Sequence, residues 1–326
     1  MDKVRNHSFD HLRVIAIGLI ILMHSPLSGS APGVVLSTIS YLTAPGIGLF
    51  FMLSGALLLN NTQSTKVFLK RRFTKIAFPT LFWTFFYLAI TPNDNAPLWQ
   101  QILSIPFSAQ GHGVLWFMYT LAGLYLITPI LSRWIQRASK KEIEFYLLLW
   151  LITLCYPYLK YSILINDNNT GILYYFSGYL GYFVLGYYLK HFYSLRWWHI
   201  VLTIVTVITT PILLLISGVN YDFYEVLWYL SLPVALMAFC WFALISKSSI
   251  FSNHESKAIT ATSRLSFGIY FIHIFLMRSL IWKIDFIQHM SGLVSIFVIA
   301  IFTFVASWGI IWLISKLSFS KYIIGL

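Results

Sequence analysis

Apolar runs of about 20 residues follow one another along the chain, separated by short polar and basic segments. About 20 apolar residues in a helix cross the hydrocarbon core of a bilayer. The runs do not alternate apolar and polar residues, as the strands of a transmembrane barrel do. The pattern predicts an all-α, polytopic membrane protein of about ten helices, at residues 13–30, 39–60, 76–92, 114–132, 143–160, 172–189, 199–217, 225–246, 265–283 and 292–315.

Basic residues are distributed unevenly between the two sides of these helices. With the N-terminus in the cytoplasm, 19 of the 22 Lys and Arg fall in cytoplasmic segments, and the exceptions are Lys160, Arg278 and Lys283. Cytoplasmic segments of membrane proteins carry such an excess of Lys and Arg. An odd number of helices would remove the asymmetry, so we expect both termini in the cytoplasm.

Composition agrees with this interpretation and excludes others. Only 10% of the residues are charged, whereas about 25% is usual in soluble domains. The net charge of +12 is explained by the basic residues on the cytoplasmic side of the predicted helices. We therefore expect the protein to contact membrane lipids and not nucleic acid. Cys155 and Cys240 lie in apolar runs and indicate neither a disulfide framework nor a metal site. The first run lacks a convincing cleavage signature, so we expect a retained helix and a single transmembrane domain over residues 1–326.

The first apolar run contains two titratable residues. Arg13 opens it, and His24, eleven residues later, closes it. In a helix this step is about 20° more than three full turns, so both side chains share one stripe, roughly 16 Å apart. One interpretation is an interfacial anchor and a packing histidine. Ionisable groups inside a membrane usually face a cavity or a partner, which favours a functional site.

A second intramembrane histidine lies in the ninth predicted helix. Ser266, Tyr270 and His273 are spaced i, i+4 and i+7, which places them on one helix face. His273 is nine residues beyond Arg264, about 13 Å along the helix and thus at a depth similar to that of His24. A lone histidine is more often a packing residue, but two at one depth predict a shared cavity.

The densest basic stretch is a predicted cytoplasmic loop at residues 61–75, NTQSTKVFLKRRFTK. Its charges have an ordinary explanation in the retention of cytoplasmic loops. Arg71, Arg72 and Lys75, just before Pro79, also suit a phosphorylated ligand, because arginine binds phosphate in a bidentate way.

Several motifs together resemble the acyltransferase-3 family of membrane O-acyltransferases. They run from the first predicted helix to the ninth and are closest to short members that modify the enterobacterial common antigen or exopolysaccharides. Val114 departs from the pattern, since short members often carry histidine there. The matching residues are Asp10–Arg13 with His24, GIGLFFMLSG at 46–55, FLKRR at 68–72 followed by Lys75, Leu115–Phe117 with Tyr125–Pro129, and SFGIYFIH at 266–273.

The resemblance implies transfer of an acyl group, usually acetyl, from cytoplasmic acyl-CoA to a hydroxyl of a glycan. The expected acceptor is a cell-surface glycan, such as O-antigen or exopolysaccharide, or its lipid-linked precursor, and the expected location is the bacterial cytoplasmic membrane. The resemblance assigns the essential pair to Arg13 and His24. It also places Arg71 and Arg72 near the donor, and its motifs add Trp116 and Ser266 on the donor side.

The residues fit this chemistry. The anionic end of CoA would rest on Arg71, Arg72 and Lys75, with Arg13 at a tunnel that leads to His24. A neutral imidazole can act as general base on a sugar hydroxyl, or attack the thioester itself and relay the acyl group. The sequence leaves both routes open.

Three further side chains complete the expected site. Tyr270 and His273 would polarise the thioester carbonyl or orient the acceptor. Asp10, three residues before Arg13, would pair with it and hold its guanidinium.

A transporter or flippase for a lipid-linked glycan is the main alternative, with the same polar residues as a substrate path. The two halves of the chain show no internal repeat, which many transporters have. The shared stripe of Arg13 and His24 also suits a single reaction centre better than a pathway.

Overall fold

A computed structural model describes residues 6–26, 33–91, 96–107, 109, 113–162, 171–218, 220–290 and 292–325. The described residues form helices, turns and loops and contain no strand. The chain divides into two compact units, which are described separately. Unit 1 comprises Met1–His24, Ala31–Asn60 and Leu131–Thr260, and unit 2 comprises Ser25–Ser30, Asn61–Ile130 and Ala261–Leu326. The expectation of a single domain over residues 1–326 depends on how the two units are arranged, so it stays a prediction.

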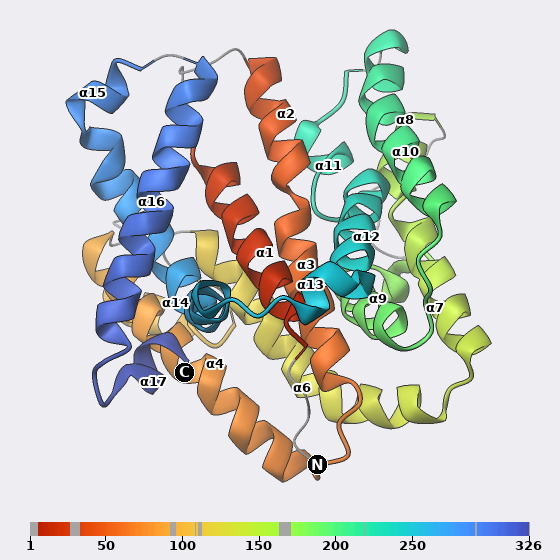
Figure 1. Cartoon of the computed structure of the whole chain (residues 1–326), viewed down its shortest axis with the longest axis horizontal. Helices are drawn as coiled ribbons and strands as arrows, with labels where there is room; N and C mark the ends of the chain where they lie inside the picture. Colours follow the sequence, from red (N-terminus) through yellow and green to blue (C-terminus); the bar gives the residue numbers. More distant parts are fainter. Residues whose placement is uncertain are drawn as a thin grey trace. The chain divides into compact units, whose positions relative to one another are not determined.

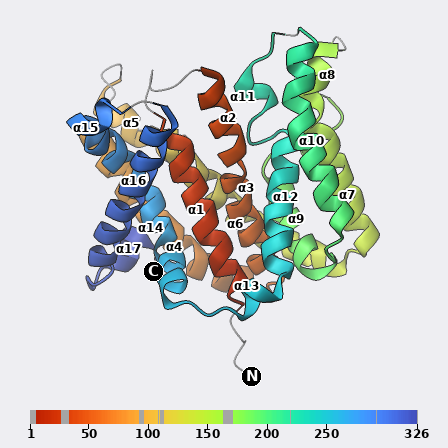
Figure 2. The same cartoon turned by 45° about the horizontal axis from the view of Figure 1, so that its top comes forward.

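Unit 1 contains the first three helices and a group from the middle of the chain. Within it, α7, α9, α10 and α12 lie side by side in both views (Figures 1 and 2). Its elements are α1 (Ser8–His24), α2 (Gly33–Thr43), α3 (Pro45–Leu58), α7 (Lys140–Thr153), α8 (Tyr156–Ser162), η2 (Tyr174–Phe176), α9 (Leu180–His191), α10 (Trp197–Ile216), α11 (Phe223–Val226), α12 (Leu232–Lys247) and α13 (Ser249–Asn253).

Unit 2 contains the basic helix and the C-terminal helices. Its elements are α4 (Thr65–Ile90), α5 (Leu98–Ser104), η1 (Gly113–Leu115), η3 (Ile281–Lys283), α15 (Asp285–Gln288), α16 (Gly292–Ile314) and α17 (Ser320–Ile324). Two helices cross the division between the units, α6 (Trp116–Arg137) and α14 (Lys257–Ser279).

All ten predicted transmembrane segments overlap helices. Seven helical segments in the described part of the chain are long and apolar enough to cross a membrane, and the shorter helices α1, α9 and α12 coincide with the other three predictions. The all-α, multi-pass membrane architecture is therefore confirmed. The number ten and the cytoplasmic termini stay predictions.

Glycines bring α3 close to α9. A Cβ on Gly55 would lie 1.7 Å from the carbonyl oxygen of Phe183, and one on Gly186 would lie 1.9 Å from that of Met52. These distances leave no room for a side chain, so the two backbones are in direct contact. Small residues permit such close packing in membrane helices. The motif at 46–55 is thus a packing surface of unit 1.

The basic stretch is helical, and the predicted loop at 61–75 is wrong from Thr65 onward. The segment contains Lys, Leu and Arg, which favour helix, and no Gly or Pro. It therefore continues into the apolar part of α4, which is one unbroken ribbon (Figure 1). Pro79 lies inside the helix and cannot donate a hydrogen bond to the carbonyl of Lys75.

The C-terminal helix α17 packs against α4 in unit 2. Trp83 Nε1 donates to the carbonyl of Ile323 at 2.9 Å, and Phe78 meets Tyr322 edge to face with ring centroids 5.3 Å apart. Ile324 is 1% exposed, and Gly325 ends the helix with a φ of 72°. Gly325 approaches the Lys75 carbonyl oxygen closely. The end of α17 therefore covers the carbonyl that Pro79 leaves without its helical N–H donor.

Candidate active site

The helix α1 positions Asp10, Arg13 and His24 on one rigid element. It begins at Ser8, upstream of the predicted membrane span, which starts at residue 13. The Asn6 Oδ1 accepts hydrogen bonds from the backbone nitrogen and the hydroxyl of Ser8, at 3.0 and 2.6 Å. The helix is continuous from Arg13 to His24, so the predicted common stripe is confirmed.

Asp10 and Arg13 form the predicted ion pair at the start of α1. The Arg13 Nη1 lies 3.4 Å from the Asp10 Oδ1, and their side chains are 27% and 3% exposed. A carboxylate this deeply buried needs a charged or hydrogen-bonded partner. The pair therefore fixes the arginine while leaving part of the guanidinium accessible.

The same end of α1 is supported by a lysine of α9. Lys190 Nζ lies 5.7 Å from the centroid of the Phe9 ring and donates to the carbonyl of Ala56 at 2.8 Å. Sequence reasoning counted Lys190 only as a topology signal. Its position just after the predicted segment 172–189 gave no indication of this partner.

The far end of α1 is held by tyrosines of unit 1. His24 is the last residue of the helix and is half-buried. The buried Tyr229 hydroxyl lies 3.4 Å from the sulfur of Met23, and Tyr182 donates to the Tyr229 carbonyl at 2.6 Å. The residue next to His24 is thus fixed, while the imidazole remains partly accessible.

Tyr270 and His273 are held firmly within α14. The Tyr270 hydroxyl donates to the carbonyl of Val114, and His273 Nδ1 lies within hydrogen-bond distance of the Tyr270 carbonyl. Tyr270 is 2% exposed and His273 is fully buried. Phe117, at the start of α6, packs against the Tyr270 ring with centroids 5.1 Å apart. Short members of the resembling family often carry histidine at position 114. Here Val114 contacts Tyr270 through its backbone carbonyl.

The remaining predicted residues lie on helices of unit 2. Ser266 is buried and donates to the carbonyl of Ser263 at 2.9 Å. Trp116 is half-buried and begins α6. Arg71, Arg72 and Lys75 are exposed on α4.

Within each unit, one pair of the predicted residues is in contact. Asp10 contacts Arg13, and Tyr270 contacts His273. The expected meeting of His24 with His273 and with the basic residues of α4 involves both units and stays a prediction. Among the described residues, no group of three His, Cys, Asp or Glu is placed to hold a metal ion.

The acyltransferase-3 family model, described as an acyltransferase domain, matches residues 6–312 of the 326. The chain belongs to this family. It is therefore a multi-pass membrane acyltransferase. No curated protein and no solved structure matches the chain.

Membership of the acyltransferase-3 family confirms the resemblance drawn from the motifs. The match extends across residues of both units, from α1 to α16. It establishes the class of reaction, and the roles of individual residues follow from chemistry and geometry.

Proposed function

We propose that the protein is an acyl-CoA-dependent O-acyltransferase of the bacterial cytoplasmic membrane. It transfers an acyl group, most simply acetyl, from cytoplasmic acyl-CoA to a hydroxyl of a cell-surface glycan or its lipid-linked precursor. The observation that carries the proposal is the arrangement on α1. An ion pair with the buried Asp10 holds Arg13 at one end, and a half-buried His24 lies on the same stripe at the other.

His24 is proposed as the reacting base. Its imidazole accepts the proton of the acceptor hydroxyl while the hydroxyl oxygen attacks the thioester carbonyl. The carbon–sulfur bond breaks, and the CoA thiolate leaves and is protonated. In the relay route the imidazole nitrogen attacks first and expels the thiolate, and the hydroxyl then takes the acyl group from the nitrogen. Both routes balance without any further reactant.

Donor binding is proposed for the exposed cations of α4. Arg71, Arg72 and Lys75 present two guanidinium groups and an ammonium on one helix. The phosphates of CoA match them in charge, and guanidinium groups bind phosphate through two parallel hydrogen bonds. Trp116 and Ser266 are proposed to contact the donor, as the family motifs imply.

Tyr270 and His273 are proposed to act on the substrate's carbonyl or on the acceptor's orientation. Their observed hydrogen bonds to the backbone of Val114 and Tyr270 support positioning more than proton transfer. A side chain fixed in this way can shape one wall of a site without exchanging its proton during the reaction.

The test is transfer by the full-length protein in lipid vesicles. Vesicles carrying a lipid-linked glycan receive radiolabelled acetyl-CoA on the side of the exposed basic residues. Base-labile label on the glycan is expected with the wild type and not with His24→Gln. Translocation of the glycan without labelling would instead support a flippase. The matched control is His289→Gln, which changes an exposed histidine of unit 2.

A further inference from the structure

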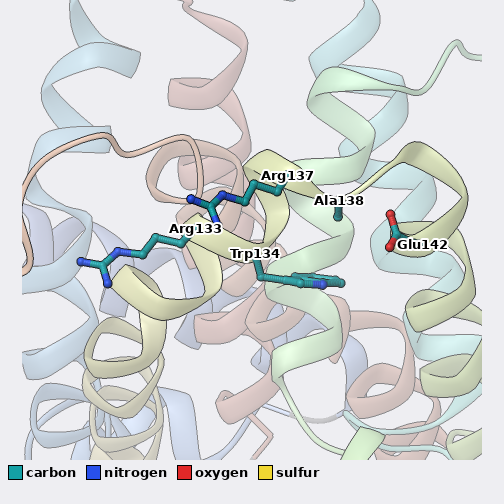
Figure 3. A pocket seen from close by; sticks show the side chains of 5 residues that line it. All are labelled: Arg133, Trp134, Arg137, Ala138 and Glu142. Carbon is teal, nitrogen blue, oxygen red and sulfur yellow. The ribbon is translucent and has the colours of Figure 1, made fainter.

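The turn between α6 and α7 borders an open surface recess that no predicted role explains. It has a volume of about 320 Å³ and is lined by Arg133, Trp134, Arg137, Ala138 and Glu142, all in unit 1. The arginines and the tryptophan come from the last turns of α6, and Glu142 comes from the first turn of α7 (Figure 3). This turn is in a segment predicted to be cytoplasmic, where CoA is available.

Two arginines provide phosphate-binding groups on one side of the recess. Arg133 and Arg137 are four residues apart, so they are neighbours on the helix surface. Both are exposed, and both guanidinium groups extend to the same side of α6 (Figure 3). Such a pair suits a dianionic phosphate, which can accept hydrogen bonds from both guanidinium groups.

An aromatic ring lies on the other side. The Trp134 indole extends toward the side of α7 and is 37% exposed (Figure 3). Tyr146 of α7 supports it edge to face, with ring centroids 5.9 Å apart. Ala138, one turn along, has a side chain too small to cover the indole. A fixed, open indole is a platform on which a base can stack.

Glu142 adds an acceptor beside this platform. Its Oε2 accepts from the backbone nitrogen of Ser139 at 2.6 Å, and its own nitrogen donates to the Ser139 hydroxyl at 3.3 Å. This capping box fixes the carboxylate at the start of α7. A carboxylate has further acceptor capacity and can bind an exocyclic amine such as that of adenine.

We propose that this recess binds the adenosine 3′-phosphate end of acyl-CoA. Adenine stacks on Trp134 with its amine toward Glu142, and the ribose phosphate rests on Arg133 and Arg137. The inference rests on the proposed use of acyl-CoA as donor. An anionic lipid headgroup shares the phosphate but has no base to stack on Trp134.

The test measures binding of adenosine 3′,5′-bisphosphate and CoA to the full-length protein in nanodiscs, without acceptor. Trp134→Leu and Arg137→Gln are each expected to weaken binding on the order of tenfold. Trp134→Phe, which keeps a stacking ring, is expected to retain most of the affinity. The wild type should prefer CoA to dephospho-CoA, and Arg137→Gln should lose that preference.

Arg196→Gln and Trp197→Leu are the matched controls, because they remove an exposed arginine and an exposed tryptophan elsewhere in unit 1. Unchanged nucleotide affinity in the recess variants would overturn the inference. So would loss of co-purified phosphatidylglycerol alone, measured by native mass spectrometry. Neither result affects the proposed function, which fails only if the wild type does not transfer acetyl from acetyl-CoA.

Discussion

The helices α1 and α14 carry the same arrangement in sequence but present it differently. Each has an arginine near one end and a histidine further along. In α1 the arginine is paired with the buried Asp10, and His24 is half-buried at the helix end. In α14 Arg264 is exposed, and His273, which lies well within the helix and not at its end, is fully buried.

This difference in exposure separates the proposed reacting residue, His24, from the proposed supporting residue, His273. A general base must reach the proton that it removes. His24 retains access, whereas His273 is enclosed and lies against the backbone of its own helix. Similar depth along a helix therefore does not imply similar chemistry. On the proposed mechanism, the reacting base lies on α1, and the histidine of α14 has a structural role.

The largest expected effect is the loss of the base. Replacing His24 with Gln should lower acyl transfer at least about 100-fold, because a positioned base contributes roughly that factor or more. The measurement is single-turnover transfer from labelled acetyl-CoA at equal amounts of folded protein. His273→Gln is the comparison on α14, and an equal loss there in a protein that melts normally would break the distinction.

The next largest effect on transfer is expected for Arg13 of α1, compared with Arg264 of α14. Arg13→Gln removes the cation that is paired with the buried Asp10 carboxylate, which should cost about 1–3 kcal/mol of stability. Transfer should fall roughly tenfold or more, as expected when an electrostatic group at a reaction centre is removed. Thermal unfolding and initial rates measure both quantities. Arg264→Gln should change neither appreciably, since it removes an exposed charge, and matched losses in the two variants would contradict the contrast.

Donor binding sharpens the comparison because it should depend on α4 and leave the chemistry of α1 unchanged. Arg71→Gln with Arg72→Gln should raise the KM for acetyl-CoA by about tenfold and change kcat little. Lys66→Gln, which removes an exposed charge from the first turn of the same helix, is the control. A fall in kcat with unchanged KM would place these arginines at the reaction centre instead.

The smallest effect on transfer is expected for Tyr270→Phe. The change removes the buried hydrogen bond to the Val114 carbonyl, which should cost about 0.5–1.5 kcal/mol of stability. The kcat of the folded protein should stay within about threefold of the wild type. A normal melting temperature with a kcat as low as that of His24→Gln would make Tyr270 a catalytic residue.

Local spacing predicted what lies on a single helix. The pairing of Asp10 with Arg13 is an i, i+3 contact and is confirmed. Ser266, Tyr270 and His273 are all buried, in a part of α14 that is buried on every side. The helix around residues 65–75 was missed because charge was interpreted as a loop signal, although its residues favour helix.

Partners distant in the chain could not be predicted in this way. Tyr270 bonds to Val114, which is 156 residues away, and Trp83 bonds to Ile323, which is 240 residues away. No local period encodes such pairs, because they depend on how helices pack. The recess beside Trp134 belongs to the same class, although the spacing of Arg133 and Arg137 at a helix end was a readable signal.

The most direct test of the assignment to α1 is the acyl content of surface polysaccharide from cells that carry the wild type, His24→Gln or His289→Gln. Proton NMR before and after mild base measures the ester-linked acetyl groups, and immunoblots of membranes confirm equal amounts of protein. We expect the base-labile signal to disappear only in His24→Gln, with the amount of polymer unchanged. Normal acetylation in that variant would contradict the account.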